Sequence, residues 1–191
     1  MRKSGFGVHA FAIEGFGMPT KRQAANAARD NKAKSTGMDA ASALDLLEED
    51  HVQVDDLFEK YEQLDNAEEK KELALKICLA LRVHAQIEEE IFYPAVRDAI
   101  ENTDRIDEAI VEHAAAKQLI AEIEEMDASD ELYDAKVTVL KEQVLHHIGE
   151  EEDELFPEVE SSGIDLGALG QKLAERKATL LKQMTQQGQS R

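Results

Sequence analysis

Four stretches of this chain place hydrophobic residues at alternating spacings of three and four, between residues 44 and 155. This spacing puts the apolar side chains on one face of an α-helix, where helices bury them against one another. Pro94 follows the second stretch and Pro157 follows the fourth. Because proline lacks the backbone N–H that a helix needs, both helices are expected to stop there. The predicted helices cover residues 44–61, 73–91, 106–123 and 137–155.

Short polar segments connect these helices, for example at residues 102–104 and 127–130. Neighbouring helices with short connections pack antiparallel. The predicted fold class is therefore all-α, an antiparallel up-down-up-down four-helix bundle. After a Ser-Ser-Gly break at residues 161–163, the helical period returns and predicts an extra, C-terminal amphipathic helix on the outside of the bundle. The apolar positions of this fifth helix are Leu166, Leu169, Leu173, Leu180 and Met184.

The first 37 residues have a different character, with seven basic and two acidic residues and no sustained apolar period. We expect a disordered basic N-terminal tail. An alternative is that Met18 is the true start and residues 1–17 are an upstream reading. The predicted organisation is thus a tail over 1–37, a helix bundle over 38–160 and a packed C-terminal helix over 161–191.

The charge excludes two classes of partner. The chain has 41 acidic and 22 basic residues, for a net charge of −19, and residues 38–191 alone carry −24. Such a surface repels nucleic acid and anionic membranes, and no apolar run approaches the roughly 20 residues of a membrane span. The single cysteine, Cys78, has no disulfide partner within the chain. It is interpreted as a small core residue and favours a reducing, cytoplasmic location.

Each of the four apolar faces contains one histidine, at intervals that repeat. His51 precedes His84 by 33 residues and His113 precedes His147 by 34, so the chain contains two similar helical hairpins. The second histidine of each hairpin is followed four residues later by a glutamate, which is one helical turn. These glutamates are Glu88 and Glu151. The repeat predicts that four imidazoles and two carboxylates meet in the bundle core.

Imidazole and carboxylate without thiolate are the ligands that suit iron, manganese or zinc. A closed tetrahedral zinc site needs only four ligands, so six favour a dinuclear site that keeps positions open for a small ligand. A mononuclear site and a structural bundle with hydrogen-bonded histidines are the alternatives. His146 competes with His147 because Glu150 follows it by four residues, although the helical phase favours His147. The other carboxylates of the acidic run 150–154 are expected to be solvated, and Tyr93 to close the end of the bundle.

The motifs Glu-Asp-His51, His84-Ala-Gln-Ile-Glu88, Val-Glu-His113 and His147-Ile-Gly-Glu-Glu151 resemble those of the hemerythrin-like (HHE cation-binding) domain proteins. The resemblance covers about residues 40–160. It implies a four-helix bundle that holds two non-haem iron ions, with an oxo or hydroxo bridge. The matching metal ligands are His51, His84, Glu88, His113, His147 and Glu151.

Two departures from the oxygen-carrying hemerythrins stand out. Those proteins have a fifth histidine where this chain has Ala109, and a His-x-x-x-x-Asp motif in the last helix where this chain has Glu151 at the fourth position after His147. One iron would lack a protein ligand, which weakens the case for reversible oxygen carriage. The main hypothesis is a protein that binds metal and a small ligand, dioxygen or nitric oxide, or iron itself, for sensing, storage or scavenging. The alternative is a di-iron oxidoreductase acting on peroxide or nitric oxide.

Overall fold

The computed structural model describes residues 41–188, and this part of the chain is helical without any β-strand. Predictions about residues 1–37, including disorder and a start at Met18, lie outside the described residues, and the domain boundaries stay predictions. None of the helices described is both long enough and apolar enough to cross a membrane.

The elements are α2 (Ala43–Glu62), α3 (Ala67–Ile87), a π-helical turn η1 (Glu88–Phe92), α4 (Tyr93–Arg97), α5 (Asp104–Glu125), α6 (Tyr133–Glu150), a π-helical turn η2 (Glu151–Leu155), α7 (Phe156–Ser161) and α8 (Leu166–Gly188).

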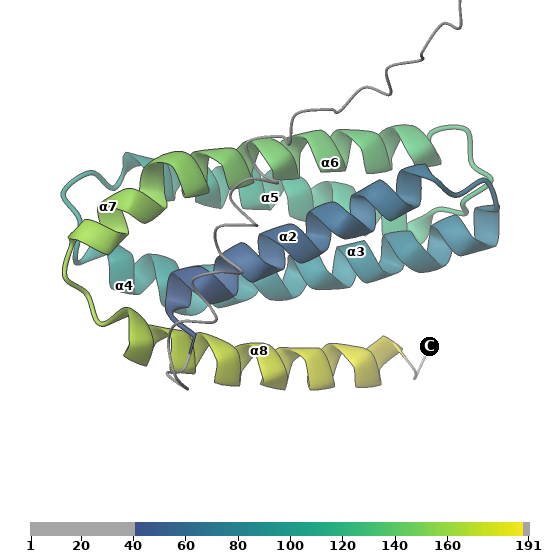
Figure 1. The fold of residues 1–191 in the computed structure, drawn as a ribbon. Helices are drawn as coiled ribbons and strands as arrows, with labels where there is room; N and C mark the ends of the chain where they lie inside the picture. The colour runs from purple at the N-terminus through teal and green to yellow at the C-terminus, as the bar shows by residue number, and fades with distance from the viewer. Residues whose placement is uncertain (1–40, 189–191) are drawn as a thin grey trace, which may run out of the picture. The chain divides into compact units, whose positions relative to one another are not determined.

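The four long helices α2, α3, α5 and α6 lie side by side (Figure 1). Helix α2 packs against α3 and α6, and α5 packs against the same two helices, while α8 packs across α2 and α3. Side-chain caps fix where helices begin. The Ser42 hydroxyl accepts from the backbone N–H of Asp45 at the start of α2, and the Asn66 side chain accepts from Glu68 and Glu69 at the start of α3.

Two apolar clusters fill the interior, separated by the layer that contains the histidines. One cluster includes Leu47, Ile87 and Leu155, and the other includes Ile120 and Leu140. The expectation for Cys78 agrees with its place in the second cluster, where burial raises the pKa of its thiol to about 12. Such a thiol is a poor nucleophile and acts as packing.

The prediction that helices stop at Pro94 and Pro157 is wrong. A π-helical turn precedes each proline, and a further α-helical segment follows it. Within these turns, the backbone N–H of Tyr93 donates to the Glu88 carbonyl, and that of Phe156 donates to the Glu151 carbonyl. The wider turn accommodates the proline ring, which would otherwise clash with the carbonyl four residues earlier. Both helices therefore continue, and each π-helical turn begins at one of the predicted metal-binding glutamates.

Candidate metal centre

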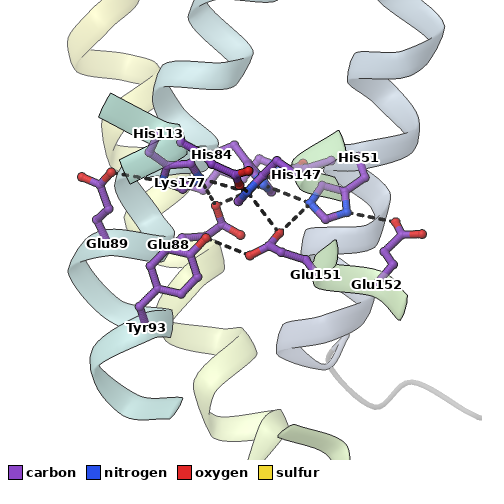
Figure 2. A network of polar contacts seen from close by, with 12 residues as sticks. His51, His84, Glu88, Glu89, Tyr93, His113, His147, Glu151, Glu152 and Lys177 are labelled. Atoms are coloured by element: carbon purple, nitrogen blue, oxygen red, sulfur yellow. Dashed lines mark hydrogen bonds and ion pairs between the residues drawn. The ribbon is translucent and has the colours of Figure 1, made fainter. Parts of the chain in front are cut away.

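The six predicted metal ligands converge in one buried layer between the four long helices (Figure 2). His84 is the most exposed of the six, at 8%, and Glu88 is fully buried. We call His51 and His84 the first half-site, and His113 and His147 the second half-site. In each half-site the two histidines come from consecutive long helices of one hairpin.

Within the first half-site, the Nε2 atoms of His51 and His84 lie 3.1 Å apart. The carboxylate oxygen Oε2 of Glu88 lies 3.2 Å from His84 Nε2, and Oε2 of Glu151 lies 3.4 Å from His51 Nε2. Each imidazole of this half-site therefore faces a different glutamate, one from its own hairpin and one from the other.

The second half-site repeats this geometry. The Nε2 atoms of His113 and His147 lie 3.1 Å apart. Oε2 of Glu88 is 3.4 Å from His113 Nε2, and Oε2 of Glu151 is 3.5 Å from His147 Nε2. Each glutamate thus lies between an imidazole of one half-site and an imidazole of the other, so we call Glu88 and Glu151 the bridging carboxylates.

Among the described residues, three oxygens of the bridging carboxylates accept no hydrogen bond, although Oε2 of each lies 3.2–3.5 Å from imidazole nitrogens. These are both oxygens of Glu88 and Oε2 of Glu151. A buried carboxylate left in this state is unfavourable, whereas a cation beside it is stabilising. The donor atoms of His51, His84, Glu88 and Glu151 lie within 4.8 Å of one another, as do those of Glu88, His113 and His147. The residues present fit two metal ions, one in each half-site.

The imidazoles and carboxylates of this layer shift one another's pKa values. Burial lowers the pKa of His84, but the Glu88 carboxylate and Asp50 outweigh it and raise that pKa to about 10. Burial likewise opposes protonation of His147, yet Glu151 and Glu112 raise its pKa to about 9. In the metal-free chain these imidazoles hold protons, which a bound metal would replace.

In each of the four histidines of this layer, the outward nitrogen faces a further carboxylate. Two of these acids directly precede the first histidine of their own hairpin. Asp50 Oδ2 lies 3.4 Å from His84 Nδ1, and Glu112 Oε2 lies 2.8 Å from His147 Nδ1. A carboxylate that holds the proton on Nδ1 fixes the ring and directs the Nε2 lone pair inward.

The other two acids directly follow a bridging carboxylate and act across the hairpins. Glu152 Oε1 lies 2.9 Å from His51 Nδ1, and Glu89 Oε1 lies 3.1 Å from His113 Nδ1. The His113 contact and Lys117 lower the pKa of Glu89 to about 2. The expectation that the acidic run 150–154 is solvated apart from Glu151 is therefore wrong for Glu152.

The four outer carboxylates are not among the predicted site residues, although the sequence contains a signal for them. An acid stands directly before the first histidine of each hairpin and directly after each bridging carboxylate, at matching positions of the repeat. The outer carboxylates are Asp50, Glu89, Glu112 and Glu152.

Tyr93 does more than close the end of the bundle. Its hydroxyl donates a 2.8 Å hydrogen bond to Glu151 Oε1 (Figure 2). Burial and the nearby Glu151 carboxylate raise its pKa well above the ordinary value, so the phenol keeps its proton. The same position of the other hairpin is Phe156, whose ring stacks on His51 with centroids 5.9 Å apart. The aromatic residues therefore break the symmetry of the repeat.

Two hollows reach this layer. A cavity of about 130 Å³ touches all four imidazoles and is walled by Val54, Leu81, Ala116, Ile120 and Val144, among others. A cleft of about 20 Å³ lies beside Ala109 and reaches His147 and Glu151, which is room for about one water molecule. Ala109 is itself buried and brings no donor atom.

His146 does not enter the layer. Its side chain is 65% exposed and lies 3.3 Å from Glu150 at the surface, whereas His147 points inward. The helical phase that favours His147 over His146 therefore agrees with the structure.

Comparison with known proteins places this arrangement in a family. The family model for the Hemerythrin HHE cation binding domain matches residues 42–159. A crystal structure of a hemerythrin HHE cation binding domain-containing protein from Mycobacterium kansasii superposes with a TM-score of 0.64 at 26% identity, over 73% of this chain and 87% of that one.

A curated protein from Nostoc sp. (strain PCC 7120 / SAG 25.82 / UTEX 2576), named a DNA nickase, is 29% identical over 118 residues, which is 62% of this chain. The chain spans only 33% of the length of that relative. The family model itself covers more than half of the chain, including all six residues of the buried layer. The chain belongs to the hemerythrin HHE cation-binding domain family.

Proposed function

We propose that this chain holds two non-haem iron ions and binds a small ligand, dioxygen or nitric oxide, or iron itself, for sensing, storage or scavenging. The observation that carries the proposal is the position of the bridging carboxylates. Glu88 and Glu151 are buried, have oxygens that accept no hydrogen bond among the described residues and lie within 3.5 Å of imidazole nitrogens of both half-sites. In the metal-free chain these carboxylates are compensated by protonated imidazoles, and metal ions bound between them would replace those protons.

The supporting architecture is the antiparallel up-down-up-down four-helix bundle. The α2–α3 and α5–α6 connections lie at one end of the bundle, and the α3–α5 connection lies at the other end (Figure 1). The two hairpins therefore run side by side, and their histidines meet in one layer. The first half-site would hold one ion through His51 and His84, and the second the other through His113 and His147. Both ions would share the bridging carboxylates.

Iron fits the donor set, because imidazole and carboxylate without thiolate suit it, and the family resemblance implies it. Bound iron would supply redox change and exchangeable coordination positions. The chain's own residues do the positioning. The outer carboxylates hold the Nδ1 protons of the histidines, and the Tyr93 hydroxyl holds Glu151 Oε1.

The cavity supports a small apolar ligand. Its volume of about 130 Å³ is larger than dioxygen or nitric oxide needs, and much of its wall is aliphatic. Beside the four imidazoles, it is also lined by the polar side chains of Asp50, Gln53, Glu112, Lys117, Gln143 and Lys177. We also expect the protein in a reducing, cytoplasmic compartment.

A di-iron oxidoreductase acting on peroxide or nitric oxide is the second candidate, and the cleft beside Ala109 favours it. A position without a fifth histidine can exchange a ligand during turnover as well as hold one. Consumption of peroxide or nitric oxide by the iron-loaded chain, abolished in His113→Ala, would support the enzyme. Stoichiometric binding without turnover would support the binding protein.

Nucleic acid cleavage is not part of this proposal, although one relative is named a DNA nickase. The match covers only a third of that relative. Residues 38–191 of this chain carry a net charge of −24, which opposes a phosphate backbone. Conversion of supercoiled plasmid to open circles by the purified chain would contradict this view.

Metal analysis tests the proposal. We expect the full chain, loaded anaerobically with Fe²⁺ and desalted, to retain two iron ions by elemental analysis. His146→Ala is the matched control, because this neighbouring histidine lies at the surface, and it should also retain two. A wild-type chain that retains no iron would overturn the proposal.

A further inference from the structure

The C-terminal helix α8 lies outside the four long helices, yet one of its side chains reaches the surroundings of the metal centre. The Lys177 Nζ atom bonds Oδ1 of Asp50. The other oxygen of Asp50 lies 3.4 Å from Nδ1 of His84. A chain of contacts thus runs from α8 through one outer carboxylate to a predicted metal ligand of the first half-site.

Asp50 needs such a partner because it is almost buried, with 9% of its side chain exposed. The Lys177 ammonium bonds one of its oxygens, and the other oxygen faces the imidazole of His84.

The second half-site also has a lysine on an outer carboxylate, but without α8. Glu89, the outer carboxylate of His113, is held by Lys117 at 2.6 Å. Lys117 belongs to α5, one helical turn after His113. In the first half-site the lysine comes from a helix that packs on the outside of the bundle, and it holds the acid before a first histidine rather than the acid after a bridging carboxylate.

Helix α8 also reaches the π-helical turn that begins at Glu88. Arg176 bonds both carboxylate oxygens of Glu90 in η1, at 2.6 and 3.1 Å. The helix is anchored by the buried side chains of Leu169, Leu173 and Leu180. Because these anchors are apolar and lie on both sides of residues 176 and 177, α8 presents Lys177 in a fixed place.

We propose that Lys177 is a positioning residue for the metal centre, acting through Asp50 on the imidazole of His84. The proposal rests on the proposed function, since it assumes that His84 binds metal. Without the lysine, the Asp50 carboxylate is free to turn toward solvent and His84 loses the acceptor that orients it. The retention of one metal ion, in the first half-site, then depends on a helix outside the bundle.

The test is the release of metal from the full chain into an excess of chelator, followed by absorbance. We expect Lys177→Met to release one of its two ions about 10-fold faster than wild type, as is typical when an outer hydrogen-bond partner of a metal ligand is lost. The other ion should leave at the wild-type rate. Lys177→Arg keeps a cation near Asp50 and should restore slow release.

Two further variants make the outcome decisive. Lys182→Met removes an exposed lysine from the same helix and should release both ions at the wild-type rates. Asp50→Asn should reproduce the selective release of Lys177→Met, which tests the contact from the other side. Equal release by wild type and Lys177→Met, or equal acceleration of both ions, would overturn the inference. A wild-type chain that retains no metal would overturn the proposed function instead.

Discussion

The two half-sites have the same inner ligands and different surroundings. Each consists of two histidines whose Nε2 atoms lie 3.1 Å apart, and each is in contact with both bridging carboxylates. The residues that hold the outer carboxylates in place differ. The lysine that holds an outer carboxylate comes from α8 at the first half-site, as Lys177, and from α5 at the second, as Lys117. The repeat therefore sets the donor atoms, and the departures from it make one half-site distinguishable from the other.

The aromatic residues and the hollows extend this difference. Phe156 stacks on His51 in the first half-site, whereas the Tyr93 ring lies 5.7 Å from His113 in the second and its hydroxyl binds Glu151. The small cleft beside Ala109 reaches the second half-site. The second half-site thus has an additional hydroxyl and an additional hollow beside it, and under the proposed function we expect a small ligand to exchange there.

The largest effect should come from removing what the half-sites share. Glu88→Ala or Glu151→Ala should weaken the binding of both ions by more than about 100-fold, above the range seen for outer partners of metal ligands. Equilibrium dialysis with elemental analysis measures this. Glu150→Ala, one position earlier and at the surface, is the control and should retain both ions. If Glu88→Ala still retained two ions, the claim that both half-sites share Glu88 would be contradicted.

The second largest effect should be that of pH on the stability of the metal-free chain, and it should involve both half-sites. The pKa values of His84 and His147 are raised to about 10 and about 9, above the ordinary value near 6.5. Their contribution to stability is therefore complete below pH 6.5 and is lost as pH rises through 9 and 10. The Tm of the metal-free chain should fall by several degrees from pH 7 to pH 10, since about 1 kcal/mol is worth 2–4 °C in a chain of this size.

The metal-loaded chain is the comparison, because bound metal replaces those protons. Its Tm should change less over the same interval. Calorimetry on both forms measures the difference, and a metal-free Tm that stays flat or rises would contradict the assigned charges of the two histidines.

The helix pattern and the inner ligands could be predicted from the sequence because both follow a period. A histidine in phase with Leu47 and Val54 must face the core, and a glutamate four residues after a histidine shares its face. The continuation of the helix past Pro94 could not be predicted, because proline is compatible with a helix stop and with a π-helical turn, and no local pattern decides between them. Nor does any local pattern connect Lys177 with Asp50, which are 127 residues apart.

Removing the tyrosine hydroxyl should make the aromatic positions of the two hairpins alike. Tyr93→Phe leaves Glu151 Oε1 buried without its donor, and we expect a loss of about 1.5–3 kcal/mol of stability, as for hydrogen bonds to charged groups. Chemical denaturation measures it. Phe156→Leu, which removes a buried ring that stacks on His51 and packs edge-on against Phe92, is the companion variant. No loss on Tyr93→Phe would mean that the hydroxyl does not support Glu151.

The docking of α8 can be weakened without touching the metal centre. A Cβ at Gly170 would collide with the carbonyl oxygen of Ala41, whereas a Cβ at Gly149 has nothing within 4 Å. Gly170→Ala should destabilise the chain by about 1–3 kcal/mol, and Gly149→Ala should stabilise it by about 0.5–1 kcal/mol. Gly170→Ala should also speed the release of the first half-site ion alone. Equal release of both ions would show that α8 does not distinguish the half-sites.

The smallest effect should be on the rate at which a small ligand reaches the metal centre. Ala116 lines the large cavity and Ala109 lines the small cleft. If the small ligand enters through the apolar cavity, Ala116→Val should slow nitric oxide binding several-fold, and Ala109→Val should slow it less. Stopped-flow absorbance of the iron-loaded chain measures both rates. The reverse order would identify the cleft as the entrance.

Mössbauer spectroscopy of the ⁵⁷Fe-loaded chain tests the central claim most directly, because it counts the ions and shows whether they interact. Two buried carboxylates shared by both half-sites predict two iron ions per chain with coupled spins. One ion per chain, or two ions that behave independently, would contradict the account.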